Sequence, residues 1–112
     1  MITTHVLDTA RGCPAEGVRV ALEQIDATEQ WQVVGHGVTD GNGRLGTLVS
    51  APVAPAAGVY RLTFDTRAYF AERGVRAFFP HVVVTFEVAD AAAHYHVPLL
   101  LSPFGYTTYR GS

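Results

Sequence analysis

Apolar and polar residues alternate along most of this chain, and a period of two residues is the pattern of a β-strand with one buried face. In the segment GVRVALEQID (residues 17–26), Val18, Val20 and Leu22 lie on one side of such a strand. Comparable runs occupy residues 31–39, 43–49, 58–66, 81–90, 94–103 and 105–110. Short strands at this close spacing predict an all-β sandwich of two packed sheets.

One stretch favours a helix over a strand. In DTRAYFAERG (residues 65–74), Asp65 or Thr66 can cap the start of a helix and Gly74 can close its end. Residues 50–58 contain two prolines and show no period, which predicts a loop.

The sequence DGNG (residues 40–43) predicts a tight turn, because asparagine and glycine tolerate the positive φ of such turns. We expect it to join the strands at 31–39 and 43–49 into a hairpin and to present Arg44. The same run is similar to the start of a calcium-binding loop, but the acidic residue that closes such a loop is missing. The run therefore predicts a turn and not a metal site.

Length and composition indicate one folded domain that spans residues 1–112. A chain of this size can bury a substantial core, and its residues are 48% apolar and 16% charged. The net charge of −2 provides no basic surface for nucleic acid. All eight basic residues are arginine, which excludes lysine Schiff-base chemistry, and a single cysteine, Cys13, excludes an internal disulfide.

The sequence predicts neither a membrane span nor a secretory signal. The longest apolar run, VPLLL, is far too short to cross a bilayer, and the segment MITTHVLDTARG lacks a basic start and an apolar core. We expect a soluble protein with a cytoplasmic location.

Two histidines are expected on an outward strand face. In HYHVPLLLSP (residues 94–103), Tyr95 and every second residue after it form the better core face, so His96 and Pro98 face outward. The alternation in THVLDTARG gives His5 the same outward direction. A face that combines these histidines with apolar neighbours and is exposed in one chain needs a partner.

Two other kinds of site are possible in this sequence, a zinc site and a cysteine nucleophile. His94 and His96 form an i, i+2 pair on one strand face, and His5 could complete a zinc site, but no further ligand is evident on a neighbouring strand. Cys13 lies in a turn with no base nearby in sequence, which argues against a nucleophile. His36 and His81 have no such neighbours in the sequence, and we expect them to be structural or surface residues.

Three segments together resemble the 5-hydroxyisourate hydrolases, the transthyretin-related proteins of purine breakdown: THVLDTARGCPAEGVRVAL, TDGNGRL and HYHVPLLLSPFGYTTYRGS. The resemblance runs from residue 2 to residue 112, and the final YRGS is its most specific part. It implies a transthyretin-like fold of two four-stranded antiparallel sheets with one short helix. It also implies a homotetramer, a dimer of dimers, whose central channel is lined by the sheet that carries His5 and His96.

The resemblance further implies which residues act. The catalytic set would be His5, Arg44 and His96, with His96 as the general base, His5 orienting water or shuttling a proton, and Arg44 stabilising charge on substrate oxygens; the two histidines could exchange roles. The C-terminal tail would fold over the channel mouth and bind substrate through Tyr109, Arg110, Gly111 and Ser112. Gly111 would allow a bend, and the Ser112 hydroxyl or carboxylate would lie near the reacting groups.

The implied reaction is hydrolysis of 5-hydroxyisourate to 2-oxo-4-hydroxy-4-carboxy-5-ureidoimidazoline in urate degradation, with no metal or organic cofactor. A carrier of the transthyretin type, which binds a hydrophobic hormone without catalysis, is the alternative, because one fold can serve both. Two histidines and an arginine make the expected channel too polar for such a carrier. A third possibility is a small accessory sandwich of the kind attached to larger enzymes.

Overall fold

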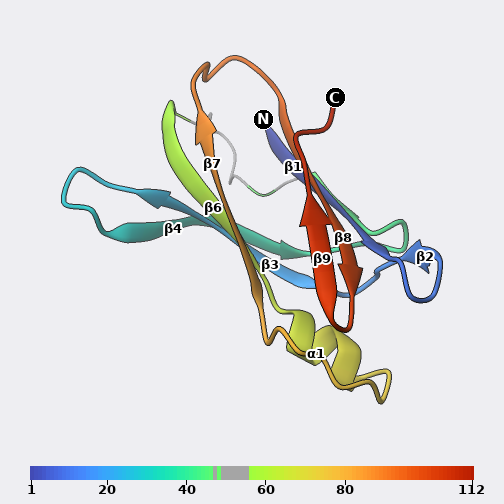
Figure 1. Cartoon of the computed structure of the whole chain (residues 1–112). Coiled ribbons are helices and arrows are strands. Elements are labelled where there is room, and N and C mark those ends of the chain that lie inside the picture. The colour runs from blue at the N-terminus through green and yellow to red at the C-terminus, as the bar shows by residue number, and fades with distance from the viewer. Residues whose placement is uncertain (47, 49–55) are drawn as a thin grey trace.

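The computed structural model describes residues 1–46, 48 and 56–112, and its strands form two packed sheets (Figure 1). One sheet, called the β1 sheet below, has the strand order β2 (Cys13–Pro14), β1 (Ile2–Asp8), β8 (Tyr95–Ser102) and β9 (Gly105–Thr108), and β5 (Arg44–Leu45) also pairs with β1. The other, the β3 sheet, has the order β4 (Trp31–Val38), β3 (Arg19–Ile25), β6 (Gly58–Phe64) and β7 (Val82–Val88). The predicted all-β sandwich is confirmed.

Two details of the sheets differ from the expectation. The β1 sheet has five strands, and β1 and β8 run parallel, whereas all other strand pairs described are antiparallel. The expected hairpin between 31–39 and 43–49 is wrong, because β5 pairs with β1 and not with β4. The DGNG turn therefore carries the chain from one sheet to the other. Residues 47 and 49 of the expected strand, and 50–55 of the expected loop, lie outside the described residues.

The core lies between the sheets and follows the period-two pattern. Along β1, burial alternates at every residue from Ile2 to Asp8. Along β8, the predicted inward residues are at most 6% exposed: Tyr95, Val97, Leu99 and Leu101. Each large aliphatic side chain buried in this way contributes roughly 1.5–3 kcal/mol. The side chains on the outward face of β1 are therefore not part of the core.

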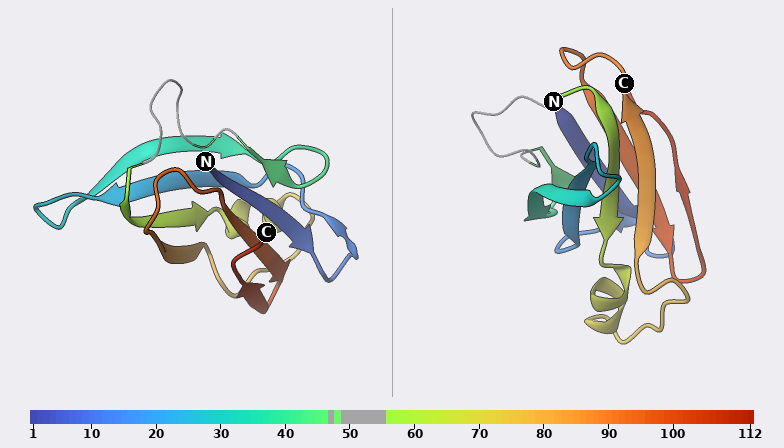
Figure 2. Two further views of the ribbon diagram at one scale, coloured as in Figure 1. Left: turned by 90° about the horizontal axis from the view of Figure 1, so that it is seen from above. Right: turned by 90° about the vertical axis from the view of Figure 1, so that its left-hand side faces the viewer.

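The short helix α1 (Thr66–Ala71) follows β6 and confirms the helix expected within residues 65–74. The Asp65 carboxylate accepts a hydrogen bond from the Ala68 N–H at 3.2 Å, so it is the N-cap. Gly74 has φ +69° just beyond the helix, where glycine is favoured. The helix lies at one end of the sandwich, and both chain termini lie at the other (Figure 1 and Figure 2). Among the described segments, no helix combines the length and apolar character that a membrane crossing requires.

Candidate active site

The outward face of the β1 sheet gathers side chains from three strands. In the parallel pair β1 and β8, Thr3 lies opposite His96 and His5 lies opposite Pro98. In the antiparallel pair β1 and β5, His5 lies opposite Arg44. Residues opposite one another on neighbouring strands project to the same side of a sheet, so these groups share one face.

The DGNG turn fixes where Arg44 lies. The Asp40 carboxylate accepts hydrogen bonds from the N–H groups of Asn42, at 2.8 Å, and Arg44, at 3.0 Å. These bonds hold the pKa of Asp40 below its usual value. The carbonyl of Gly43 accepts a bond from the Val6 N–H at 2.7 Å, which fastens the turn to β1. Gly43 has φ +74°, and a Cβ there would lie 2.3 Å from the Val6 carbonyl oxygen, so the turn requires glycine.

The same turn also orients His5. Its Nε2 lies 2.8 Å from the backbone carbonyl oxygen of Asn42. A carbonyl oxygen can only accept a hydrogen bond, so Nε2 carries a proton, and the lone pair of a neutral ring would be on Nδ1. The half-buried imidazole of His5 is thus held in one tautomer beside Arg44.

His96 is joined to His94 through a hydroxyl group. The Thr3 Oγ1 atom lies 2.8 Å from His96 Nδ1 and 2.9 Å from His94 Nε2. Partial burial lowers the pKa of His96, and the charge of Arg44, together with that of His5 or His94 when either is protonated, lowers it further. Both effects favour the neutral form of the His96 imidazole.

A cavity of about 240 Å³ opens on this face. Of the residues proposed from sequence, it brings together Arg44, His96 and Ser112. His5 does not line it, although it pairs with Arg44 along the sheet. The other lining residues are Thr3, Thr4, Leu45, Gly46 and His94.

Sequence reasoning assigned no role in the reaction to Thr3 or His94. His94 has the same strand parity as His96, so its direction could have been used as a signal. Thr3 becomes the neighbour of His96 only through the parallel pairing of β1 with β8, and the two residues are 93 positions apart. No local pattern reports such a pairing.

The C-terminal tail continues along the edge of β8. The Gly111 N–H donates a hydrogen bond to the His96 carbonyl oxygen at 2.8 Å. A Cβ at position 111 would lie 2.6 Å from Cδ2 of the His96 ring and 3.3 Å from the Pro98 ring. Gly111 is therefore required for close contact with the imidazole. Pro98, expected to be exposed, is buried at this contact.

The other two tail residues do not line this cavity within one chain. Tyr109 is 56% exposed. The Arg110 guanidinium lies over the Tyr95 ring, 4.6 Å from its centre, in a cation–π contact. Both side chains are thus separate from the group formed by Arg44 and His96.

The zinc alternative gains no support from the described part of the chain, in which no cluster of three or more His, Cys, Asp or Glu residues is placed to hold a metal ion. The facing nitrogens of His94 and His96 are bridged by Thr3 instead. Cys13 is a free, partly buried thiol at the edge strand β2.

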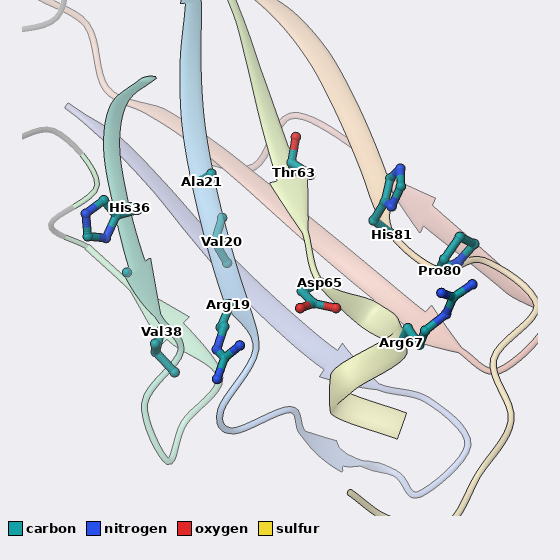
Figure 3. Close-up of a pocket in the computed structure, with 11 residues that line it drawn as sticks. Arg19, Val20, Ala21, His36, Val38, Thr63, Asp65, Arg67, Pro80 and His81 are labelled. Atoms are coloured by element: carbon teal, nitrogen blue, oxygen red, sulfur yellow. The ribbon is translucent and has the colours of Figure 1, made fainter. Parts of the chain in front are cut away.

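A larger cavity of about 600 Å³ lies on the outer surface of the β3 sheet (Figure 3). Its lining includes both histidines expected to be structural or surface residues, His36 and His81, and both are exposed. They lie at opposite sides of the cavity in Figure 3, and they do not converge on one point. None of the site residues proposed from sequence lines this cavity.

Comparison with known proteins agrees with this sandwich fold. Residues 2–111 match the HIUase/Transthyretin family. A 5-hydroxyisourate hydrolase of Mus musculus is 46% identical, with 99% of this chain and 94% of that protein covered. The 5-hydroxyisourate hydrolase of Pseudomonas aeruginosa is 42% identical, with 99% and 90% covered. The chain therefore belongs to the HIUase/Transthyretin family.

Solved structures from both branches of the family are similar to this fold. The 5-hydroxyisourate hydrolase of Klebsiella pneumoniae superposes with a TM-score of 0.84 at 38% identity, covering 99% of this chain and 98% of that one. Sea bream transthyretin in complex with thyroxine superposes with a TM-score of 0.91 at 36% identity, covering 98% and 93%. The fold is thus shared by an enzyme and a hormone-binding protein, and the side chains of the site must decide between them.

Proposed function

We propose that this chain hydrolyses 5-hydroxyisourate to 2-oxo-4-hydroxy-4-carboxy-5-ureidoimidazoline in urate degradation, without a metal or organic cofactor. The single observation that carries the proposal is a partly buried imidazole of lowered pKa, His96, that shares a small cavity with Arg44. Named hydrolases at 42–46% identity over nearly the whole chain support the substrate. A base beside a permanent cation suits the addition of water to a carbonyl group, and it does not suit an apolar hormone.

The reaction begins at His96. Its Nδ1 faces Thr3, so Nε2 is the nitrogen left for a water molecule. Nε2 accepts a proton from that water while the water oxygen bonds to the ring carbonyl carbon, and the carbonyl electron pair moves to oxygen. When the carbonyl re-forms, the carbon–nitrogen bond breaks and the ring nitrogen takes the proton from His96 Nε2, which frees the base again. The lowered pKa of His96 keeps it available as the base at neutral pH.

Arg44 and His5 support this step. The guanidinium of Arg44 stays charged and stabilises the negative charge that develops on the carbonyl oxygen. His5, with its Nε2 proton held by the Asn42 carbonyl, offers the Nδ1 lone pair to orient the water. Exchange of the two histidine roles is the alternative assignment.

The working enzyme in this proposal is a homotetramer, a dimer of dimers, whose channel is lined by the outward face of the β1 sheet. Ser112 already lines the cavity of the single chain, and Tyr109 and Arg110 contact the purine-derived substrate only in the assembled channel. The partly exposed row of Thr3, His5 and Leu7 is consistent with a face that a second copy covers.

An ultraviolet assay of freshly generated 5-hydroxyisourate tests the proposal against the carrier alternative. We expect the purified chain to accelerate loss of the substrate well above the spontaneous rate, in the presence of a chelator as well as in its absence. Binding of thyroid hormone is measured on the same preparation. Hormone binding without any acceleration would overturn the proposed function and favour the carrier.

A further inference from the structure

The Thr3 hydroxyl group connects the proposed base to a second histidine, and the mechanism above leaves this connection unused. We propose that Thr3 and His94 are positioning residues that set the tautomer of His96 and carry away the proton that it takes from water. This inference rests on the proposed function, because it concerns the same base.

Hydrogen counting limits how the three groups can be arranged. A threonine hydroxyl has one hydrogen to donate, and here it faces one nitrogen from each imidazole, at 2.8 and 2.9 Å. While both rings are neutral, Thr3 can donate to at most one of these nitrogens, so at least one of them carries a proton and donates to the hydroxyl oxygen. If it donates to His94 Nε2, then His96 Nδ1 carries a proton and His96 Nε2 has the lone pair that a base needs. The reverse arrangement places the proton on His96 Nε2 and leaves no base there.

The surroundings favour moving charge from His96 to His94. His96 is partly buried, and Arg44 and His5 disfavour a positive charge on it, as its lowered pKa reflects. His94 is exposed, so water solvates a positive charge there. The ring centres are 6.3 Å apart, a separation that the single Thr3 oxygen bridges.

The transfer balances without any further reactant. An O–H bond of the attacking water breaks and a bond from His96 Nε2 to hydrogen forms. The Nδ1–H bond of His96 breaks as Thr3 Oγ1 gains that proton, and Thr3 passes its own proton to His94 Nε2. His96 ends neutral in its other tautomer, His94 ends as the cation, and the hydroxide oxygen is bonded to the substrate carbon. When the ring nitrogen takes the Nε2 proton of His96, Thr3 returns a proton to His96 Nδ1 and takes one from His94 Nε2, which restores the starting arrangement.

The backbone holds the three groups in this order. Thr3 lies directly opposite His96 in the parallel pair, and the Thr3 hydroxyl group reaches His94, the residue just before β8 begins. Thr3 is β-branched and half-buried, so its hydroxyl has few rotamers available.

The kinetic test removes the hydroxyl group and keeps the shape. Thr3→Val is expected to lower kcat at least about tenfold with little change in KM, because a positioned proton acceptor contributes that much or more. Thr3→Ser keeps a hydroxyl group and should retain most of the activity. Thr85→Val changes an exposed threonine of β7 in the other sheet and serves as the matched control. Unchanged kcat in Thr3→Val would overturn the proposal.

A double-mutant cycle distinguishes a proton relay through both residues from two independent effects on activity. His94→Phe keeps a ring but has no nitrogen to receive a proton, so it should lose about as much kcat as Thr3→Val. The double variant should lose no more than the worse single variant, because both substitutions interrupt the same path. Losses that multiply in the double variant would mean that the two residues act independently, which contradicts the relay.

Nitrogen NMR tests the arrangement without any turnover. Folded wild-type protein near neutral pH should show His96 protonated at Nδ1, and Thr3→Val should lose this preference while Thr3→Ser keeps it. A wild-type His96 protonated at Nε2 would contradict the proposal. If the wild-type chain did not hydrolyse 5-hydroxyisourate at all, the proposed function would fail, and the tautomer result would still report on the Thr3 arrangement.

Discussion

His96 is the residue whose electrostatic state decides what this site can do. Its imidazole lies between a hydroxyl group on one ring nitrogen and the cavity that contains Arg44. Burial and positive neighbours both act against the imidazolium form, so the lowered pKa has causes that can be tested one at a time.

The first prediction concerns this pKa. NMR titration of the His96 ring protons should give a value below the usual histidine value of about 6.5. Arg44→Met should raise it, because a positive neighbour is removed while burial remains. Arg19→Met, on the β3 sheet, is the control and should leave it unchanged. A His96 pKa above about 6.5 in the wild-type protein would contradict the account.

The sign of the pH dependence follows from the same shift. A base works in its neutral form, so activity should persist as the pH falls below about 6.5 and decline only near the lowered pKa. Between these two values the unfolded chain binds a proton at His96 that the folded chain does not. His96 therefore makes the free energy of unfolding decrease as the pH decreases through that window.

A second residue-scale prediction concerns Gly111. In Gly111→Ala, the new methyl group would meet the His96 ring at 2.6 Å, so the ring or the tail must move. We expect turnover to fall on the order of a hundredfold, as a misplacement of about 1 Å can cause, while the thermal unfolding midpoint changes little.

Gly105→Ala on β9 is the matched control for Gly111→Ala. A Cβ at position 105 would make only an ordinary contact of 3.7 Å with Ser102 Oγ, and its activity should stay near that of the wild type. Wild-type turnover in Gly111→Ala would show that the close contact with His96 has no functional role.

At the scale of elements, β9 and the tail act as one extended segment along β8. Leu99 of β8 pairs with Thr108 of β9. His96 pairs with Gly111 in the same antiparallel register, so the tail continues the line of β9. The cation–π contact of Arg110 with Tyr95 holds the segment on its other side. This edge therefore positions Ser112 at the cavity.

Deletion of residues 109–112 should leave the sandwich folded and remove most of the activity. The two-sheet core does not include these residues, so circular dichroism should be close to that of the wild type. The deletion exposes His96 and Pro98 and removes Ser112 from the cavity. Full turnover in the deleted protein would show that the tail is dispensable.

The sequence predicted the strands because alternation is a local signal, and it predicted the single helix because its caps are local too. The hairpin at DGNG was wrong, because a turn pattern does not report which strand will receive the chain after it. Here the bond between Gly43 and Val6 attaches the turn to β1. The parallel pairing of β1 with β8, and with it the bridge from Thr3 to His96, depends on contacts between residues far apart in sequence.

For the whole protein, we predict a tetramer. Large apolar side chains remain exposed on the single chain near the β8–β9 turn, where Phe104 is 76% and Tyr106 is 41% exposed. Exposed apolar groups of this kind favour association. Light scattering at assay concentration should give the mass of four chains of 12.1 kDa each. A fully active monomer of 12.1 kDa would contradict the proposed channel.

The most direct test is the rate of 5-hydroxyisourate hydrolysis by His96→Ala, compared with the wild type and with His36→Ala from the β3 sheet. The account predicts that His36→Ala matches the wild type, while His96→Ala loses on the order of a hundredfold or more in turnover with its oligomeric state unchanged. Arg44→Ala should show a loss of similar size, because it removes the charge that stabilises the oxyanion. Turnover by His96→Ala at the wild-type rate would contradict the account, because no base would then be needed at this position.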